Sequence, residues 1–243
     1  MTRRRWIADE VDLGRNRAAL LGENAVHLAR VLRAKVGQQF DMVLPGGDST
    51  VRTARVTSVA DSRVEFDLGE PLQIAPAVRQ VFLYLAIFKF DRMEWAIEKV
   101  AELGVAGIVP LIAGRTEKHL AAAAERRVER WRRILRQAAQ QSRSNQLAEI
   151  SAPLKLADAV AQADRSAAHI VLAENEKQVG LKDLLGELGN PHQLTIAIGP
   201  EGGWTSTELA LFTQSGWRSA SLGPAILRAE TAAIAALSVV LSG

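Results

Sequence analysis

Apolar and polar residues alternate in the first third of the chain. The alternation covers residues 40–44 and continues in two further short runs at 51–59 and 64–68. A period of two is typical of strands with one buried face, and the PGGD segment at 45–48 supplies a turn between the first two runs. We therefore predict a small antiparallel meander in this region that closes into a β-barrel.

After residue 72 the pattern changes to unbroken apolar runs that alternate with amphipathic stretches. An unbroken apolar run is typical of a strand covered on both faces, and strands that alternate with helices favour a parallel sheet between two helical layers. The predicted strands are residues 81–88, 107–112, 169–173, 194–198 and 218–223. The predicted helices are residues 92–103, 125–143, 181–188, 205–215 and 225–241.

The change of pattern predicts an α/β fold with two domains, residues 1–72 and 73–243. The division falls at GEPLQIAPAVRQ, where two prolines interrupt both patterns. One further helix is predicted before the meander, over residues 23–36, because Gly37 follows its last turn.

Cap residues set the ends of the first helix after the division. Asp91 and Glu94 have the spacing of a capping box before residues 92–103, and Gly104 has the position of a helix stop. We therefore expect Asp91 to cap this helix.

Composition narrows the class of protein. The 243 residues are 48% hydrophobic, enough to bury one large or two modest cores. No window is apolar enough for a membrane span and no secretory signal is present, so we expect a cytoplasmic protein. The chain lacks cysteine, and its histidines never come within metal-ligand spacing, so we expect no metal; they are His27, His119, His169 and His192.

Positive charge is concentrated in the middle of the chain. Residues 115–146 carry nine basic and three acidic side chains, although the net charge of the whole chain is only +3. In the predicted helix 125–143, apolar residues form one stripe and arginines line its flanks. This arrangement suits a polyanionic partner, and a well-solvated surface helix is the alternative.

A glycine-rich loop follows the predicted strand 194–198. The stretch IAIGPEGGWTSTE, residues 196–208, places Gly-Pro-Glu-Gly-Gly before a helix that Thr205 and Glu208 cap. Loops after parallel strands lie at the carboxyl edge of the sheet, where ligands bind, and a second glycine-proline loop follows 218–223. Exposed backbone groups in such loops could read a flat heterocycle, and a tight connection without a ligand is the alternative.

The charge of this loop indicates which ligand would suit it. No phosphate-binding motif of either common type is present, and Glu201 would repel a phosphate. A cationic centre would instead be favoured by Glu201 and by Glu174 at the end of strand 169–173.

Four segments resemble a known family. IGPEGGWTSTE and LGPAILRAETAAIAAL are similar to the two C-terminal motifs of the RsmE family, bacterial 16S ribosomal RNA uridine-N3 methyltransferases of the SPOUT superfamily. FKFDRMEWAIEKVAELGVAGIVPL resembles the segment that opens the family's catalytic domain, and HLARVLRAKVGQQF resembles its N-terminal helix and strand. The resemblance covers nearly the whole chain in order.

The resemblance implies an enzyme that uses S-adenosylmethionine (SAM) to methylate N3 of a uridine in 16S rRNA of the 30S subunit. It implies a PUA-like RNA-binding β-barrel over residues 1–72, a SPOUT methyltransferase domain with a trefoil knot over 73–243, and a homodimer. It further implies that SAM is bound by Leu172, Ala173, Glu174, Gly199, Pro200, Glu201, Gly202, Gly203, Ser221, Leu222, Gly223, Ala225, Ile226 and Leu227.

One stretch departs from the family pattern. In QQSRSNQLAEISAP, Gln140 replaces a usual glutamate, and Arg143, Ser144 and Ala148 stand where glycine, arginine and proline are common. Within this stretch we expect Gln141, Ser142 and Asn145, rather than Arg143, to take the RNA-binding or catalytic roles.

Transfer from a sulfonium to uracil N3 requires alignment of the two reactants and stabilisation of the deprotonated base. Arg228 is the leading catalytic candidate because it stands where the last helix starts, and an interface arginine is the alternative. Glu230 is the second candidate, unless it only complements the helix dipole. The residues expected to bind RNA, in addition to Gln141 and Asn145, are Arg3, Arg4, Arg5, His27, Arg30, Arg33, Arg130 and Arg133.

Three functions remain open from the sequence. They are the rRNA methyltransferase, a non-catalytic RNA-binding protein on the same fold, and an α/β enzyme that acts on a small nucleotide-like substrate.

Overall fold

The structure is a computed structural model that describes residues 5–45, 50–73, 79–142, 144, 147–189 and 191–242. The chain forms two compact units. The first contains residues 1–76 and 139–147, and the second contains residues 77–138 and 148–243. The predicted turn at 45–48 lies mostly outside the described residues.

A six-stranded sheet forms the first unit. Its spatial order is β1-β4-β5-β6-β3-β2, and every pair is antiparallel except β1 with β4. The predicted meander is confirmed as three of these strands, β4 (Gln39–Leu44), β5 (Thr50–Ala60) and β6 (Arg63–Pro71). The other three strands were not predicted; they are β1 (Arg5–Ile7), β2 (Glu10–Asp12) and β3 (Arg17–Leu21).

The sheet curls because its two edge strands are consecutive in the chain. Between them, the N–H of Ala8 donates to Val43 at 3.0 Å and the N–H of Asp9 donates to Ala19 at 2.9 Å. Ala8 therefore continues the pairing of β1 with β4, and the next residue, Asp9, begins the pairing of β2 with β3. The two edges of the sheet are thus brought together at these two adjacent residues. Irregularities in the β5–β6 register add to the bend.

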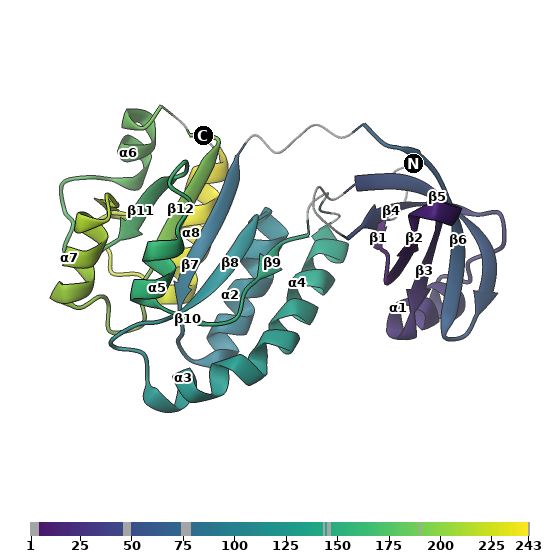
Figure 1. Ribbon diagram of the computed structural model, residues 1–243, viewed down its shortest axis with the longest axis horizontal. Coiled ribbons are helices and arrows are strands. Elements are labelled where there is room, and N and C mark those ends of the chain that lie inside the picture. The colour runs from purple at the N-terminus through teal and green to yellow at the C-terminus, as the bar shows by residue number, and fades with distance from the viewer. Residues whose placement is uncertain are drawn as a thin grey trace. The chain divides into compact units, whose positions relative to one another are not determined.

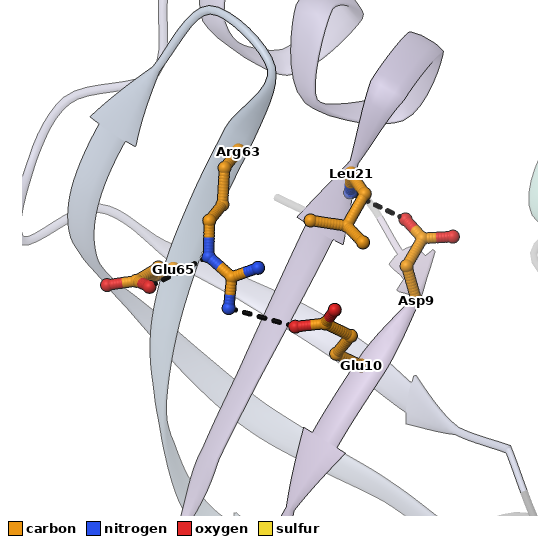
Figure 2. A network of polar contacts seen from close by, with 5 residues as sticks. All are labelled: Asp9, Glu10, Leu21, Arg63 and Glu65. Atoms are coloured by element: carbon orange, nitrogen blue, oxygen red, sulfur yellow. Dashed lines mark hydrogen bonds and ion pairs between the residues drawn. The ribbon is translucent and has the colours of Figure 1, made fainter.

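Polar contacts reinforce the joined edge (Figure 2). Arg63 on β6 reaches across β3 to Glu10 on β2 at 2.9 Å, and it also contacts Glu65 at 2.9 Å. The carboxylate of Asp9 accepts a hydrogen bond from the N–H of Leu21 at 2.8 Å. The Arg63 pairs are exposed and contribute little stability, so the apolar interior carries most of it.

The helix of the first unit is shorter than predicted. It consists of α1 (Gly22–Val26) and a π-helical turn (His27–Val31), so the expectation that it runs to residue 36 is wrong. Arg33 adopts a left-handed conformation with φ of 51°, and the N–H of Ala34 returns to the carbonyl of Leu28. That return ends the helix before Gly37, which instead opens the turn into β4.

The second unit contains an entirely parallel sheet, as predicted (Figure 1). Its spatial order is β10-β8-β7-β12-β11-β13, with β9 paired to β8. The strands are β7 (Gln80–Ala86), β8 (Gly107–Ile112), β9 (Glu149–Ile150), β10 (Leu154–Lys155), β11 (Ala168–Leu172), β12 (Gln193–Ile198) and β13 (Arg218–Ala220).

Helices cover both faces of this sheet, which confirms the α/β fold. One face packs against α2 (Phe90–Leu103), α3 (Lys118–Ala124), α4 (Val128–Ser142), α6 (Leu181–Glu187) and α8 (Ala229–Ser242). The other face packs against α5 (Leu156–Gln162) and α7 (Ser206–Gln214). Alternate residues of β7 divide between the layers, since Leu83 and Leu85 face the first and Tyr84 and Ala86 the second. Figure 1 shows α8 beside β7 and β12.

One predicted helix cap is wrong and one stop is confirmed. Helix α2 begins at Phe90 after Lys89, and no side chain caps it. Glu94 cannot complete a capping box because its carboxylate binds Arg127 at 3.3 Å and Arg130 at 2.8 Å. Gly104 ends α2 in a left-handed conformation with φ of 97°, as expected.

None of the helices within the described residues is long and apolar enough to cross a membrane.

His169 on β11 provides a pH-dependent contribution to stability. Its ring lies 4.8 Å from that of Trp217, and burial lowers the pKa of His169 despite the opposing effect of Asp164. The unfolded chain, in which the pKa of histidine is about 6.5, therefore takes up the proton first as the pH falls. We expect the free energy of unfolding to decrease from about pH 7 downward, more in the wild type than in His169→Gln. Urea unfolding at pH 7.5 and pH 5.5 measures this, and equal decreases in the two proteins would contradict it.

Candidate active site

A cavity of about 650 Å³ lies where three strands of the second unit end. Strands β12, β11 and β13 are neighbours and parallel, so their carboxyl ends lie at the same edge of the sheet. The loops after them supply most of the cavity wall. Of the residues predicted to bind a cofactor, the lining includes Leu172, Ala173, Glu174, Gly199, Pro200, Glu201, Gly203, Ser221, Leu222, Gly223, Ala225, Ile226 and Leu227.

Gly202 is the predicted cofactor residue that does not line the cavity. A Cβ placed on it would lie 3.2 Å from the Cδ of Arg115, whose guanidinium donates to the Gly202 carbonyl. The side chain of Arg115 therefore occupies the space that a side chain at position 202 would fill, and Gly202 does not border the cavity.

The loop after β12 is held by its own contacts. The N–H of Gly203 donates to the carbonyl of Pro200 at 2.8 Å, and Gly203 has a φ of 70°, which favours glycine. Trp204 is buried, and its indole Nε1 donates to the Leu172 carbonyl at 2.9 Å, which ties the loop to β11. A Cβ on Gly199 would lie 3.3 Å from the Trp204 ring. These contacts fix the loop without placing bulky side chains in its path.

The start of α7 fixes the far end of the same loop. Thr205 and Glu208 form the predicted capping box, which the structure confirms. The Glu208 carboxylate also accepts a hydrogen bond from the N–H of Gly114 at 2.7 Å, in the loop after β8. One glutamate thus joins two loops at this edge of the sheet.

The loop after β13 passes along the cavity before α8 begins. We predicted the last helix from residue 225, but α8 starts at Ala229. The Arg228 carbonyl accepts the first helical hydrogen bond, from the N–H of Ala232 at 2.8 Å. Residues 221–228 remain extended or bent, and Gly223 has a φ of 119°.

Three arginines and two glutamates line the cavity. Arg92 binds Glu201 at 2.8 Å, and Arg115 donates to the Gly202 carbonyl. The side chain of Arg228 is exposed, and within the described part of the chain its guanidinium forms no hydrogen bond or ion pair. Glu174 likewise has no ion-pair partner among the described residues. Among the described residues that line the cavity, one cationic and one anionic side chain are therefore without an ionic partner.

Glu230, the second predicted catalytic residue, does not line the cavity. Its side chain is buried, its Oε1 lies 3.8 Å from Nε of Arg92, and its Oε2 is buried without a hydrogen bond.

Two residues that line the cavity, Arg92 and Arg115, were not predicted from the sequence. Both follow strands, β7 and β8, whose carboxyl ends lie at the same edge as those of β11, β12 and β13. That position was the available signal, because any loop at this edge is a candidate for the cavity wall.

The residues predicted to bind RNA are distributed over both units. In the first unit, Arg5 pairs with Asp41, His27 packs its ring against Trp6, Arg30 binds Asp61 at 2.7 Å, and Arg33 and Gln141 are exposed. In the second unit, Arg130 binds Glu94 and Arg133 is exposed. Arg3, Arg4 and Asn145 lie outside the described residues. Among the described residues, no group of three or more histidine, cysteine, aspartate or glutamate side chains is placed to hold a metal ion.

The fold and the cavity define an α/β protein with a ligand site built by loops at the carboxyl edge of a parallel sheet. Residues 75–241 match the family model described as "RNA methyltransferase domain". Over 87% of its length the chain is 34% identical to a ribosomal RNA small subunit methyltransferase E of Synechocystis, of which it covers 68%. The protein of the same name from Mycobacterium bovis is 30% identical, with 92% of this chain and 85% of that protein covered.

Solved structures give the same result. The crystal structure of a ribosomal RNA small subunit methyltransferase E from Neisseria gonorrhoeae, bound to S-adenosyl methionine, aligns with a TM-score of 0.83 at 25% identity and covers 100% of this chain and 98% of that one. A Legionella pneumophila protein assigned as a methyltransferase, in complex with SAM, aligns with a TM-score of 0.82 at 30% identity and the same coverage. This chain therefore belongs to the ribosomal RNA small subunit methyltransferase E (RsmE) family.

Glu208 should contribute more stability than an ordinary surface glutamate. Its carboxylate accepts from the N–H of Thr205 at 2.8 Å, the hydroxyl of Thr205 at 2.9 Å and the N–H of Gly114 at 2.7 Å. We expect Glu208→Ala to lower the free energy of unfolding by about 2 kcal/mol.

Glu129→Ala is the control, because that side chain is 80% exposed and, among the described residues, pairs with Arg132 alone; a change below about 0.5 kcal/mol is expected. Urea unfolding followed by tryptophan fluorescence measures both. Equal effects would mean that Glu208 does not join the two loops.

Proposed function

We propose that this protein transfers a methyl group from S-adenosylmethionine to N3 of a uridine in the 16S rRNA of the small ribosomal subunit. The observation that carries the proposal is the convergence of three loops on one cavity, with the unpaired Arg228 beside it. The relatives' names and the SAM-bound structures support the reaction class and the rRNA substrate, and the resemblance of the C-terminal motifs supports uridine N3.

The residues of the cavity fit SAM. Gly199, Gly203 and Gly223 expose backbone groups, so a flat adenine can approach the N–H and carbonyl groups closely. The unpaired carboxylate of Glu174 can receive the ribose hydroxyls or favour the cationic half of the molecule. Glu201 is less suited than the sequence suggested, because Arg92 already offsets its charge.

SAM, when bound, supplies an electrophilic methyl group. The N3 proton would pass to solvent, and the methyl group would leave the sulfonium, which becomes the neutral thioether of S-adenosylhomocysteine. The task of the chain is to hold the acceptor base in line with the methyl group and to stabilise the deprotonated base. A guanidinium beside the uracil carbonyls stabilises negative charge that spreads onto their oxygens. We assign this role to Arg228, because Arg92 and Arg115 are already bonded to the loop after β12.

We propose that the exposed arginines bind the RNA backbone and so set its register, as phosphate contacts generally do. Arg33 and Arg133 are the strongest described candidates, because each is exposed and neither forms an ion pair within the described part of the chain. Arg30 and Arg130 would have to leave Asp61 and Glu94 to bind a phosphate. On this proposal the first unit is a PUA-like RNA-binding domain and the knotted SPOUT domain follows it.

The proposal includes a homodimer in which α8 is covered. This helix is apolar around most of its circumference, yet Ile234, Ala235 and Val239 are only partly buried in one chain. Trp95 on α2, which packs against α8, is 48% exposed. A second copy on this face would remove that apolar surface from water.

The experiment that tests the function is transfer of labelled methyl from SAM to isolated 30S subunits, with the modified base mapped by mass spectrometry. We expect label at N3 of one uridine. We also expect Arg228→Ala to lower the rate about 100-fold while the SAM dissociation constant, measured by calorimetry, stays within about threefold.

Each contrary result identifies a different error. Binding of SAM and RNA without transfer would favour the non-catalytic RNA-binding protein. Label on another atom would refute uridine N3 only, and full activity of Arg228→Ala would remove the role given to that residue.

A further inference from the structure

Arg92 connects parts of the site that are far apart in the sequence. It lies in the first turn of α2, lines the cavity, and has a side chain that is 33% exposed. Its Nη1 binds Oε1 of Glu201 at 2.8 Å, in the loop after β12. Its Nε lies 3.8 Å from Oε1 of Glu230, in the first turn of α8.

The contact with Glu230 compensates a buried charge. Glu230 is 6% exposed and its Oε2 has no hydrogen bond, whereas Glu201 is one-third exposed and can be hydrated. A buried carboxylate is costly unless a counter-charge is close. Among the described residues, Arg92 is the only basic side chain that forms an ion pair with Glu230. The position of the first turn of α8 therefore depends on Arg92.

The first turn of α8 also sets the direction of Arg228. The Arg228 carbonyl accepts the first hydrogen bond of the helix, and Glu230 follows two residues later. A shift of Glu230 therefore moves the backbone from which the Arg228 side chain extends. Small errors in the placement of a reacting group are costly, since a shift of about 1 Å can reduce a rate by about 100-fold.

We propose that Arg92 is a positioning residue that locks the loop after β12 to the first turn of α8. This lock keeps the distance and orientation between the SAM-binding backbone and Arg228 fixed. This inference rests on the proposed function for its kinetic consequence, but the lock itself is a property of the chain. Arg115 does not duplicate it, because its guanidinium donates to the Gly202 carbonyl and, among the described residues, bonds to none in α8.

Arg63→Met is a matched control for Arg92→Met. Arg63 also joins two carboxylates, Glu10 and Glu65, but it does so on the sheet of the first unit (Figure 2). Both substitutions remove one arginine that bridges two acids, and only one of them touches the proposed site.

We expect Arg92→Met to lower kcat at least tenfold and to change the dissociation constant of SAM by less than about threefold. Arg92→Lys, which keeps the charge but loses the fork of donors, should recover part of kcat. Arg63→Met should leave both quantities unchanged. A raised KM for SAM with normal kcat, or an equal kcat loss in Arg63→Met, would overturn the inference.

A second readout does not depend on activity. In hydrogen exchange without ligand, Arg92→Met should exchange faster at residues 199–203 and 229–232, and Arg63→Met should not. Unchanged exchange in both segments would overturn the lock. Absence of methyl transfer by the wild-type protein would instead refute the proposed function and leave this readout valid.

The double variant Arg92→Met/Glu230→Gln covers the case in which Arg92→Met fails to fold. It removes both charges at once, so it should fold, yet it should keep the low kcat because the lock is still missing. Wild-type kcat in a folded double variant would contradict the inference.

Discussion

The side-by-side pairing of β12, β11 and β13 is the constraint on which the site depends. Because these three neighbours are parallel, their carboxyl ends meet at one edge, and the three loops that follow them share one cavity. The loops lie up to about fifty residues apart in the sequence, and contacts such as the bond from Trp204 to the Leu172 carbonyl reinforce a proximity that the sheet sets. The apolar layers on both faces of the sheet hold this register and leave the edge free for polar backbone groups.

Charge is distributed unevenly around that edge. Two of the three arginines at the cavity bind the loop after β12: Arg92 pairs with Glu201, and Arg115 donates to the Gly202 carbonyl. Among the described residues, the side chain of the third, Arg228, has no partner. The buried Glu230 accounts for part of this division, because it requires a nearby cation. Under the proposed function, this division gives Arg92 and Arg115 the task of holding the site together and leaves Arg228 to act on the substrate.

Much of the sheet could be predicted from the sequence, because long apolar runs and glycine-proline loops are local signals. The cap of α7 was predicted for the same reason, since Thr205 and Glu208 are three residues apart. Strands β1, β2 and β3 were missed because they have only three to five residues and are held by partners elsewhere in the chain. The cap at Asp91 failed because Glu94 binds arginines more than thirty residues away.

The roles of Arg92 and Arg115 could not be predicted for a similar reason, because each acts on a loop more than eighty residues later in the chain. The most direct test of the account is a crystal structure of the protein with SAM. The account predicts the adenosyl group against residues 172–174, 199–201, Gly203 and residues 221–227, with the methyl group facing Arg228. SAM bound at another place, with these three loops closed on one another, would contradict it.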